Sequence, residues 1–449
     1  MLFDRVKELS KFGEIVAGDK KEYSIVDKIK EFFEEKKIQT YIYPQKVLFW
    51  NQKEIEIECE GKRIEAVAMP YSPSINVETT EYKVIKLNNL IEINKYYRLY
   101  KDKLLIFSLD NYMRKFVLKN GKLLSHLPQA PPEVPAFYVR EKDLQNIKGN
   151  CRFYLKSEFK ESTGYTVEAI QPAKSEEKIY VTAHHDHWFS GEHDDLISVS
   201  ILPELKSDMY ELHLISFTAE ESGCFFSSFS WACGSFYYLK NKKIDGVKMV
   251  ISLDNVTPNA KYYVTPGLSK YFPKSVQSPS AYSDSYNFLK LGIPTVTISD
   301  TSYPFYHSEV DIVNKDENFD PLIKFLNHIL NSNIQIDLEE LKNNLLSLKI
   351  PIELKVVALN LLEKNKYNEL LKFYGSVLDF STNVIETYVF HKIIGLQKAY
   401  SESYVAIEDF EEFLNSCENE ECEKNRKKYI SYLLNVISEE YLSKLENLF

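Results

Sequence analysis

The chain has 449 residues, of which 44% are hydrophobic and 27% are charged, and its formal net charge is −10. This length exceeds the usual size of a single hydrophobic core, so we expect two or three domains of ordinary size. Most of the 55 basic residues are lysines, and no arginine-rich stretch is available to follow a phosphate backbone. The composition therefore argues against nucleic acid as a partner.

The amino-terminal residues 1–11 alternate charged and apolar side chains, and no run of about 18 apolar residues occurs in the chain. We therefore expect no membrane partner and a soluble, cytoplasmic protein. The six cysteines are widely spread and form no C-x-x-C pair, so reduced thiols are the expectation. A metal or redox role for Cys417 and Cys422 is the less favoured alternative.

The pattern of apolar residues changes several times along the chain. Residues 2–12 and 23–36 carry apolar side chains at helical spacing, which predicts two amphipathic helices. Short alternating runs broken by Pro, Asn and Gly predict a β-rich insert from about 40 to 163. Residues 164–333 alternate strand-like and helix-like stretches, which predicts a mostly parallel sheet covered by helices. Residues 336–449 have a helical pattern throughout.

Side chains of the kinds that bind metals follow the predicted strands of this sheet. The strands are KIYVTAH, ELHLISFTA, KMVISLD and the apolar run 293–298. In open α/β sheets, sites form outside the carboxyl ends of the strands, so we expect these side chains to lie close together. They are His184, Asp194, Glu220, Glu221, Asp254 and His307.

Two isolated imidazoles and several carboxylates are the donors that suit Zn²⁺, and no thiolate is needed. Two metal ions about 3.5–4 Å apart need one carboxylate between them, and they can share a water molecule of lowered pKa. A neighbouring carboxylate would take the proton of that water, and the resulting hydroxide would attack a metal-polarised carbonyl. The pattern therefore predicts metal-assisted amide hydrolysis.

The motifs resemble those of the co-catalytic zinc exopeptidases, a family that includes bacterial leucyl aminopeptidases, aminopeptidase Y, glutamate carboxypeptidase and the transferrin-receptor ectodomain. Residues 183–186 (AHHD) are similar to the family's AHxD motif, and residues 219–223 (AEESG) to its AEExG motif. The resemblance implies an α/β fold with a mostly parallel mixed sheet covered by helices. It also implies a β-rich insert like a protease-associated domain and an all-α carboxyl-terminal domain.

The resemblance implies a role for each residue at the strand ends. His184 and Asp254 would hold one zinc ion, Glu221 and His307 the other, and Asp194 would lie between the two. The choice of His184 over His185 or His187 as the ligand rests mainly on the register of the AHxD motif. His187 and His193 are expected near the metal ions but not bound to them.

Three further residues would support catalysis. Glu220 would be the general base, and Asp186 would orient His184 through its carboxylate. Tyr306 would donate a hydrogen bond to the tetrahedral oxyanion. The alternative is that Tyr306 is an aromatic residue of the core with no catalytic role. The chain departs from the family at Ser198, where the family has glycine, and at Pro203, which requires the following helix to be short or bent. A further departure is the aromatic-rich insertion 224–233, which puts substrate specificity in doubt.

The implied domain order is 1–40 for the amino-terminal helices, which pack on the catalytic domain, and 41–163 for the protease-associated-like insert. Residues 164–335 would form the zinc peptidase domain and residues 336–449 the helical domain. In the glutamate carboxypeptidase and transferrin-receptor branch the helical domain mediates dimerisation, so a homodimer is a hypothesis.

The expected function is that of an exopeptidase, and specifically of an aminopeptidase, with a peptide substrate. We expect two Zn²⁺ per chain, for which Co²⁺ or Mn²⁺ could substitute. The alternatives are a carboxypeptidase-like enzyme, a glutaminyl cyclase-like enzyme with one zinc ion, and a non-catalytic binding protein of the same fold. The persistence of all five ligands and the base argues against the binding protein. Metal stoichiometry would separate the cyclase from the peptidase.

Overall fold

The computed structural model describes residues 2–371, except for gaps at 91, 101–102, 119–131, 224–231, 241, 243, 278, 281–282 and 348–351. Most of the aromatic-rich insertion therefore lies outside the described residues. The same holds for the predicted helical domain beyond residue 371, including Cys417 and Cys422. The first, described part of this predicted domain is helical and contains α8 (Leu338–Ser347) and α9 (Ile352–Glu363).

A nine-stranded mixed sheet forms the centre of the molecule, in the order β12-β13-β11-β9-β10-β8-β1-β2, with β4 also paired to β8. Four adjacent strands are parallel and confirm the four predicted strands, because runs of apolar residues buried on both faces favour a parallel sheet. They are β9 (Lys178–His184), β10 (Glu211–Phe217), β11 (Val247–Leu253) and β13 (Thr295–Ser299). β12 (Lys261–Val264) pairs antiparallel at the edge.

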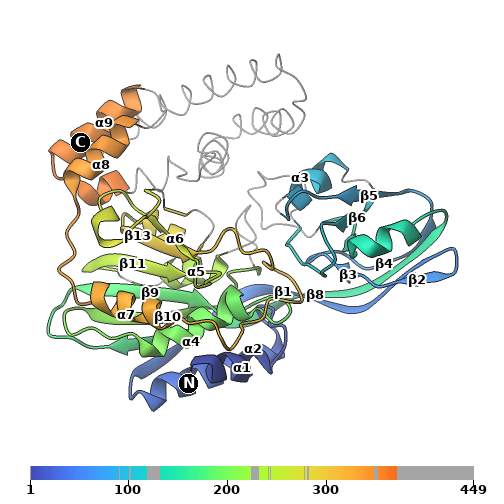
Figure 1. Ribbon diagram of the computed structural model, residues 1–449, viewed down its shortest axis with the longest axis horizontal. Coiled ribbons are helices and arrows are strands. Elements are labelled where there is room, and N and C mark those ends of the chain that lie inside the picture. The colour runs from blue at the N-terminus through green and yellow to red at the C-terminus, as the bar shows by residue number, and fades with distance from the viewer. Residues whose placement is uncertain are drawn as a thin grey trace.

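Helices cover both faces of this sheet, as expected (Figure 1). The larger core lies under α1 (Leu2–Ser10), α2 (Lys20–Glu35), α4 (Ile197–Ile201) and α7 (Asp320–Ile329). The opposite core lies under α5 (Cys233–Lys240) and α6 (Ser285–Leu289). As predicted from Pro203, α4 is short, and a 3₁₀ turn, Leu202–Glu204, follows it directly. Among the described helices, none combines the length and apolarity needed to cross a bilayer.

Two long strands, β1 (Gln39–Cys59) and β8 (Cys151–Gln171), leave the central sheet as an antiparallel ribbon (Figure 1). The ribbon carries β2 (Lys62–Ile64) and β4 (Ile75–Thr79), and it packs against a second sheet. That sheet contains β3 (Val67–Ala68), β7 (Ala136–Tyr138), β6 (Leu104–Ser108) and β5 (Tyr82–Lys86), with α3 (Glu92–Leu99) and the 3₁₀ turn Glu141–Asn146 nearby. Because β1 and β8 run through the predicted domain borders, the division at 41 and 163 stays a prediction.

The expectation of reduced thiols is wrong for the cysteines at the far end of the ribbon. Cys59 and Cys151 form a disulfide, although 92 residues separate them in the chain. The register of the ribbon places them directly opposite each other, with Cα atoms 4.1 Å apart. Cys233 is also disulfide-bonded. Cysteine spacing could not reveal the first pair, because the pairing depends on the ribbon register.

A buried charge cluster joins the ribbon to the central sheet. The carboxylate of Glu168 is fully buried and accepts hydrogen bonds from His213 Nδ1 at 2.6 Å and Lys242 Nζ at 2.8 Å. The hydroxyls of Tyr43 and Tyr238 donate at 2.8 and 2.5 Å. Burial opposes ionisation of Glu168, but these donors outweigh burial and lower its pKa to about 2.

We predict that Glu168→Gln lowers the free energy of unfolding at pH 7 by about 3 kcal/mol, because it removes the anion that pairs with Lys242 and that holds four hydrogen bonds in the buried cluster. The folded-state pKa of Glu168 lies below the ordinary value of 4.5, so its stabilisation is present above pH 4.5 and is lost as the pH falls towards 2. Urea unfolding between pH 3 and pH 7 measures the difference. Glu54→Gln, which breaks an exposed pair with Lys156, is the control, and an equal loss in both variants would contradict the prediction.

Candidate metal centre

The carboxyl ends of the parallel strands bring the predicted ligands together at one edge of the sheet. His184 is the last residue of β9, Asp254 directly follows β11, and Glu221 lies on the turn after β10. Among the described residues, two groups place one potential ligand atom of each member within 4.8 Å of the others. They are His184, Asp194 and Asp254, and then Asp194, Glu221 and His307.

Asp194 belongs to both groups and directs a different oxygen towards each. Its Oδ1 lies 3.4 Å from His184 Nε2, and its Oδ2 lies 3.3 Å from His307 Nε2. His184 Nε2 is also 4.0 Å from Asp254 Oδ1, and His307 Nε2 is 2.9 Å from Glu221 Oε1. Donors bound at 2.0–2.1 Å in a tetrahedron are about 3.3 Å apart, so these separations match shared metal coordination.

The polar atoms at the centre of these groups lack other partners. His184 Nε2, Asp194 Oδ2, Glu221 Oε1 and His307 Nε2 are buried and accept or donate no hydrogen bond. Such atoms are costly to bury, so the residues fit a pair of bound cations.

The protonation behaviour of the groups agrees with this fit. Burial raises the pKa of Glu221 to about 7 and raises that of Asp254. Burial opposes protonation of His307, but Glu221 and Asp194 outweigh it and raise its pKa to about 10. Without a cation, Glu221, Asp254 and His307 therefore hold protons at the atoms that face the ligand groups. A metal ion would compete with these protons for the same atoms.

Asp186 supports this site through different atoms from those predicted. His184 Nδ1 lies 3.0 Å from the main-chain oxygen of Asp186, not from its carboxylate. The buried carboxylate instead accepts the main-chain N–H groups of Glu220 and Glu221, at 3.0 and 3.1 Å. Asp186 thus positions the ligand His184 and the adjacent pair of glutamates together.

The neighbouring histidines direct their ring nitrogens elsewhere. His185 contacts Ser216 Oγ at 2.9 Å and Glu22 Oε1 at 3.4 Å. His187 contacts the carbonyl oxygens of His185 and Gly13. Of the three histidines that the sequence left open, only His184 lies in a ligand group.

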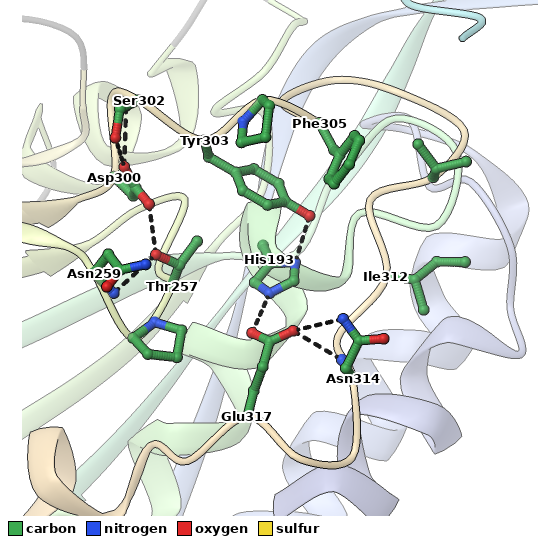
Figure 2. A pocket seen from close by; sticks show the side chains of 13 residues that line it. His193, Thr257, Asn259, Asp300, Ser302, Tyr303, Phe305, Ile312, Asn314 and Glu317 are labelled. Carbon is green, nitrogen blue, oxygen red and sulfur yellow. Dashed lines mark hydrogen bonds and ion pairs between the residues drawn. The ribbon is translucent and has the colours of Figure 1, made fainter.

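His193 borders a cavity of about 670 Å³ beside the centre (Figure 2). Its Nε2 lies 2.7 Å from Glu317 Oε2, and its Nδ1 lies 2.8 Å from the hydroxyl of Tyr303 and 2.9 Å from Asp311 Oδ1. The buried Asp311 also accepts the main-chain N–H groups of His193 and Asp194. Asp311 therefore holds the turn that carries Asp194, and the Asp194–Asp195 peptide bond in that turn is cis.

Two contacts position the ligands of the second group. His307 Nδ1 lies 3.0 Å from the main-chain oxygen of Lys115, and Trp188 Nε1 donates to Glu221 Oε2 at 3.0 Å. The sequence motifs could not reveal these two contacts. The partner of His307 is a main-chain oxygen, which any residue type supplies, and Trp188 belongs to none of the recognised motifs. Asp311, in contrast, lies in the YHSxxD run and could have been assigned from it.

Glu220 and Tyr306 face the same charges. Burial raises the pKa of Glu220 well above its usual value, and Asp254 and Asp284 act in the same direction. Burial also raises the pKa of the Tyr306 hydroxyl, together with the charges of Glu221 and Asp194. Tyr306 therefore keeps its proton and can donate a hydrogen bond, while its ring stacks on His307 with centroids 3.7 Å apart.

Comparison with known proteins gives a family match over the region that holds most of this site. Residues 166–325 match the model of Peptidase family M28. No curated protein sequence matched the chain.

Solved structures share the fold. An aminopeptidase from Aneurinibacillus sp. strain AM-1 is 19% identical with a TM-score of 0.50, over 75% of this chain and 95% of that chain. BSAP, a zinc aminopeptidase from Bacillus subtilis, is 18% identical with a TM-score of 0.50, over 73% and 91%. A Peptidase M28 precursor from Shewanella amazonensis SB2B is 15% identical with a TM-score of 0.55, over 75% and 94%. At these identities the likeness establishes the fold.

We predict that Trp188→Phe weakens zinc binding by about tenfold, because it removes the indole N–H that orients Glu221 and keeps most of the ring. A competition titration against a coloured zinc chelator measures the affinity. Trp50→Phe is the matched control, since Trp50 is also buried but donates to the carbonyl of Ser72, away from the centre. Equal affinities for the Trp188 variant and the wild type would contradict this role.

Proposed function

Because residues 166–325 match the model of Peptidase family M28, we propose that the protein is a two-zinc exopeptidase that removes amino-terminal residues from peptides. One observation carries the proposal. Asp194 presents its two carboxylate oxygens to two separate ligand groups, each completed by one imidazole and one further carboxylate. This arrangement suits a pair of hard or borderline divalent ions, for which Co²⁺ or Mn²⁺ could substitute.

His184, Asp194 and Asp254 would hold one Zn²⁺, and Asp194, Glu221 and His307 the other. Bound there, the ions would polarise the substrate carbonyl and make a water molecule more acidic. The imidazoles are oriented for this task because each has its Nδ1 at a carbonyl oxygen, which leaves Nε2 directed at the ligand group.

Glu220 would act as the proton carrier. Its carboxylate would take a proton from the attacking water and return it to the leaving amine. The main-chain N–H of Glu220 is fixed by the carboxylate of Asp186, so the turn that presents the base is held at two successive residues. Burial raises the pKa of Glu220, which favours retention of the proton that this side chain would return to the leaving amine.

Tyr306 would stabilise the reacting carbonyl oxygen. Its phenol keeps its proton under the negative charges around it, so it can donate a hydrogen bond as that oxygen gains charge. Two complete ligand groups favour the peptidase over a one-zinc cyclase. We also propose that the enzyme recognises the free amine of a peptide and not its free carboxylate.

The organisation and location of the protein also stay proposals. We propose that residues 41–163 form a protease-associated-like insert and that residues 336–449 form a helical domain that mediates a homodimer. The Cys59–Cys151 disulfide argues against the expected cytoplasmic location, because cytosolic proteins rarely keep disulfides.

We predict that Glu220→Gln lowers hydrolysis of aminoacyl substrates by about a thousandfold, because the amide cannot accept the proton of the attacking water. Zinc content should stay at the wild-type value, since Glu220 belongs to neither ligand group. Kinetics on a panel of free-amine and amine-blocked peptides, with zinc measured by mass spectrometry, test both statements.

Glu204→Gln is the matched control, because Glu204 pairs with Arg5 and Lys36 away from the site and should keep full activity. Full activity of Glu220→Gln would remove the assigned base. One zinc ion per chain together with cyclisation of amino-terminal glutamine would favour the cyclase, and cleavage of only amine-blocked peptides would favour a carboxypeptidase.

A further inference from the structure

One part of the insert (residues 41–163) that contacts the metal centre is the segment of residues 110–118, which we term the docking segment. It runs antiparallel to residues 303–309, the ligand loop that carries His307, with a bridge between Arg114 and Ser308. The N–H of Lys115 donates to the carbonyl of His307 at 3.1 Å. The N–H of Glu309 donates back to the carbonyl of Met113 at 3.0 Å. The two segments therefore form a small ladder of main-chain hydrogen bonds.

This ladder fixes a ligand. The carbonyl of Lys115 lies 3.0 Å from His307 Nδ1, and a neutral imidazole has a single N–H to donate. The bond therefore places the proton on Nδ1 and leaves the lone pair of Nε2 directed at Asp194 and Glu221.

Two arginines of the insert bind the ligand loop. Arg140 binds the carboxylate of Glu309 at 2.9 Å, and Arg114 binds the main chain of the loop. The guanidinium of Arg114 is only 3% exposed and donates to the carbonyl oxygens of Pro304 and Tyr306, at 2.6 Å each. It also binds the carboxylate of Asp110 on its own segment, at 2.6 Å. The planar guanidinium thus links the insert to the main chain of the ligand loop on both sides of Phe305, just before His307.

The other ligand of this group is also reached from the docking segment. The ammonium of Lys115 is buried, binds Glu14 at 2.6 Å and lies 5.8 Å from the centre of the Trp188 ring. Trp188 in turn donates to Glu221 Oε2. Both ligands that distinguish the second group, Glu221 and His307, therefore have supporting partners that touch the insert.

The first group is built differently. His184 is oriented by the main-chain oxygen of Asp186, two residues further along the same chain segment. Asp254 directly follows β11 of the central sheet. Neither contact involves the insert, so the two halves of the centre differ in what they depend on.

We propose that the insert completes one metal site and not the other, with Arg114 as the positioning residue that couples docking of the insert to the site of Asp194, Glu221 and His307. This inference rests on the proposed metal centre. Occupancy of that site and docking of residues 110–118 then depend on each other, because a coupling between two binding events is reciprocal.

The first experiment is a titration of the metal-free full-length protein with Co²⁺, followed by its visible absorption, and with Zn²⁺, followed by calorimetry. The wild type should show two binding events. Arg114→Lys keeps the charge and loses the fork, so it should weaken one event by about tenfold and leave the other unchanged. Arg5→Lys is the matched control, because Arg5 is equally buried and pairs with Glu204 away from the centre.

An Arg114→Lys protein with two unchanged events, or with both events weakened equally, would overturn the proposal alone. A wild type that binds fewer than two ions would overturn the metal centre and the proposal with it. The two failures are therefore distinguishable.

A second measurement needs no variant, in case Arg114→Lys does not fold. Zinc added to the wild type should slow hydrogen exchange by about tenfold at the amides of Lys115 and Glu309, which form the ladder. The amide of Val139, which donates to Phe107 within the insert, should not respond. Equal exchange at the ladder amides with and without zinc would overturn the coupling.

Discussion

The burial of negative charge at the carboxyl edge of the parallel sheet is the constraint on which the rest of the structure depends. Asp186, Asp194, Asp195 and Glu220 are buried there beside two imidazoles. Such a concentration of carboxylates opposes folding unless cations or specific donors offset it. The surrounding structure supplies the donors: Asp186 and Asp311 accept main-chain N–H groups, and carbonyl oxygens fix both imidazoles. The buried atoms that this scaffold leaves without a hydrogen-bond partner include those that face the two ligand groups.

Local patterns in the sequence predicted the parallel sheet of residues 164–333 well. The four apolar runs became β9, β10, β11 and β13, because runs buried on both faces have few alternatives to a covered parallel sheet. Family motifs then placed the ligand-type residues at the strand ends, where the structure brings all five together. The shortness of α4 also followed from a single residue, Pro203.

Two of the features that sequence reasoning missed depend on contacts between distant segments. The Cys59–Cys151 pair follows from the register of a ribbon whose strands are far apart in the chain. The partner of His307 Nδ1 is a main-chain oxygen, and any residue type at position 115 could supply it. The sequence predicted that the carboxylate of Asp186 orients His184, but His184 Nδ1 lies at the main-chain oxygen of Asp186, and the carboxylate accepts the N–H groups of Glu220 and Glu221.

The disulfide at the far end of the ribbon acquires a meaning from what it encloses. Cys59 and Cys151 close a covalent ring, and the docking segment with Arg114 and Lys115 lies inside that ring. A closed ring has far fewer conformations than an open chain, so it keeps the docking segment at a high effective concentration beside the ligand loop. A thiol reductant could therefore loosen His307, a proposed metal ligand, without touching it. Reduction would open the ring that keeps Lys115, whose main-chain oxygen contacts His307, beside the ligand loop.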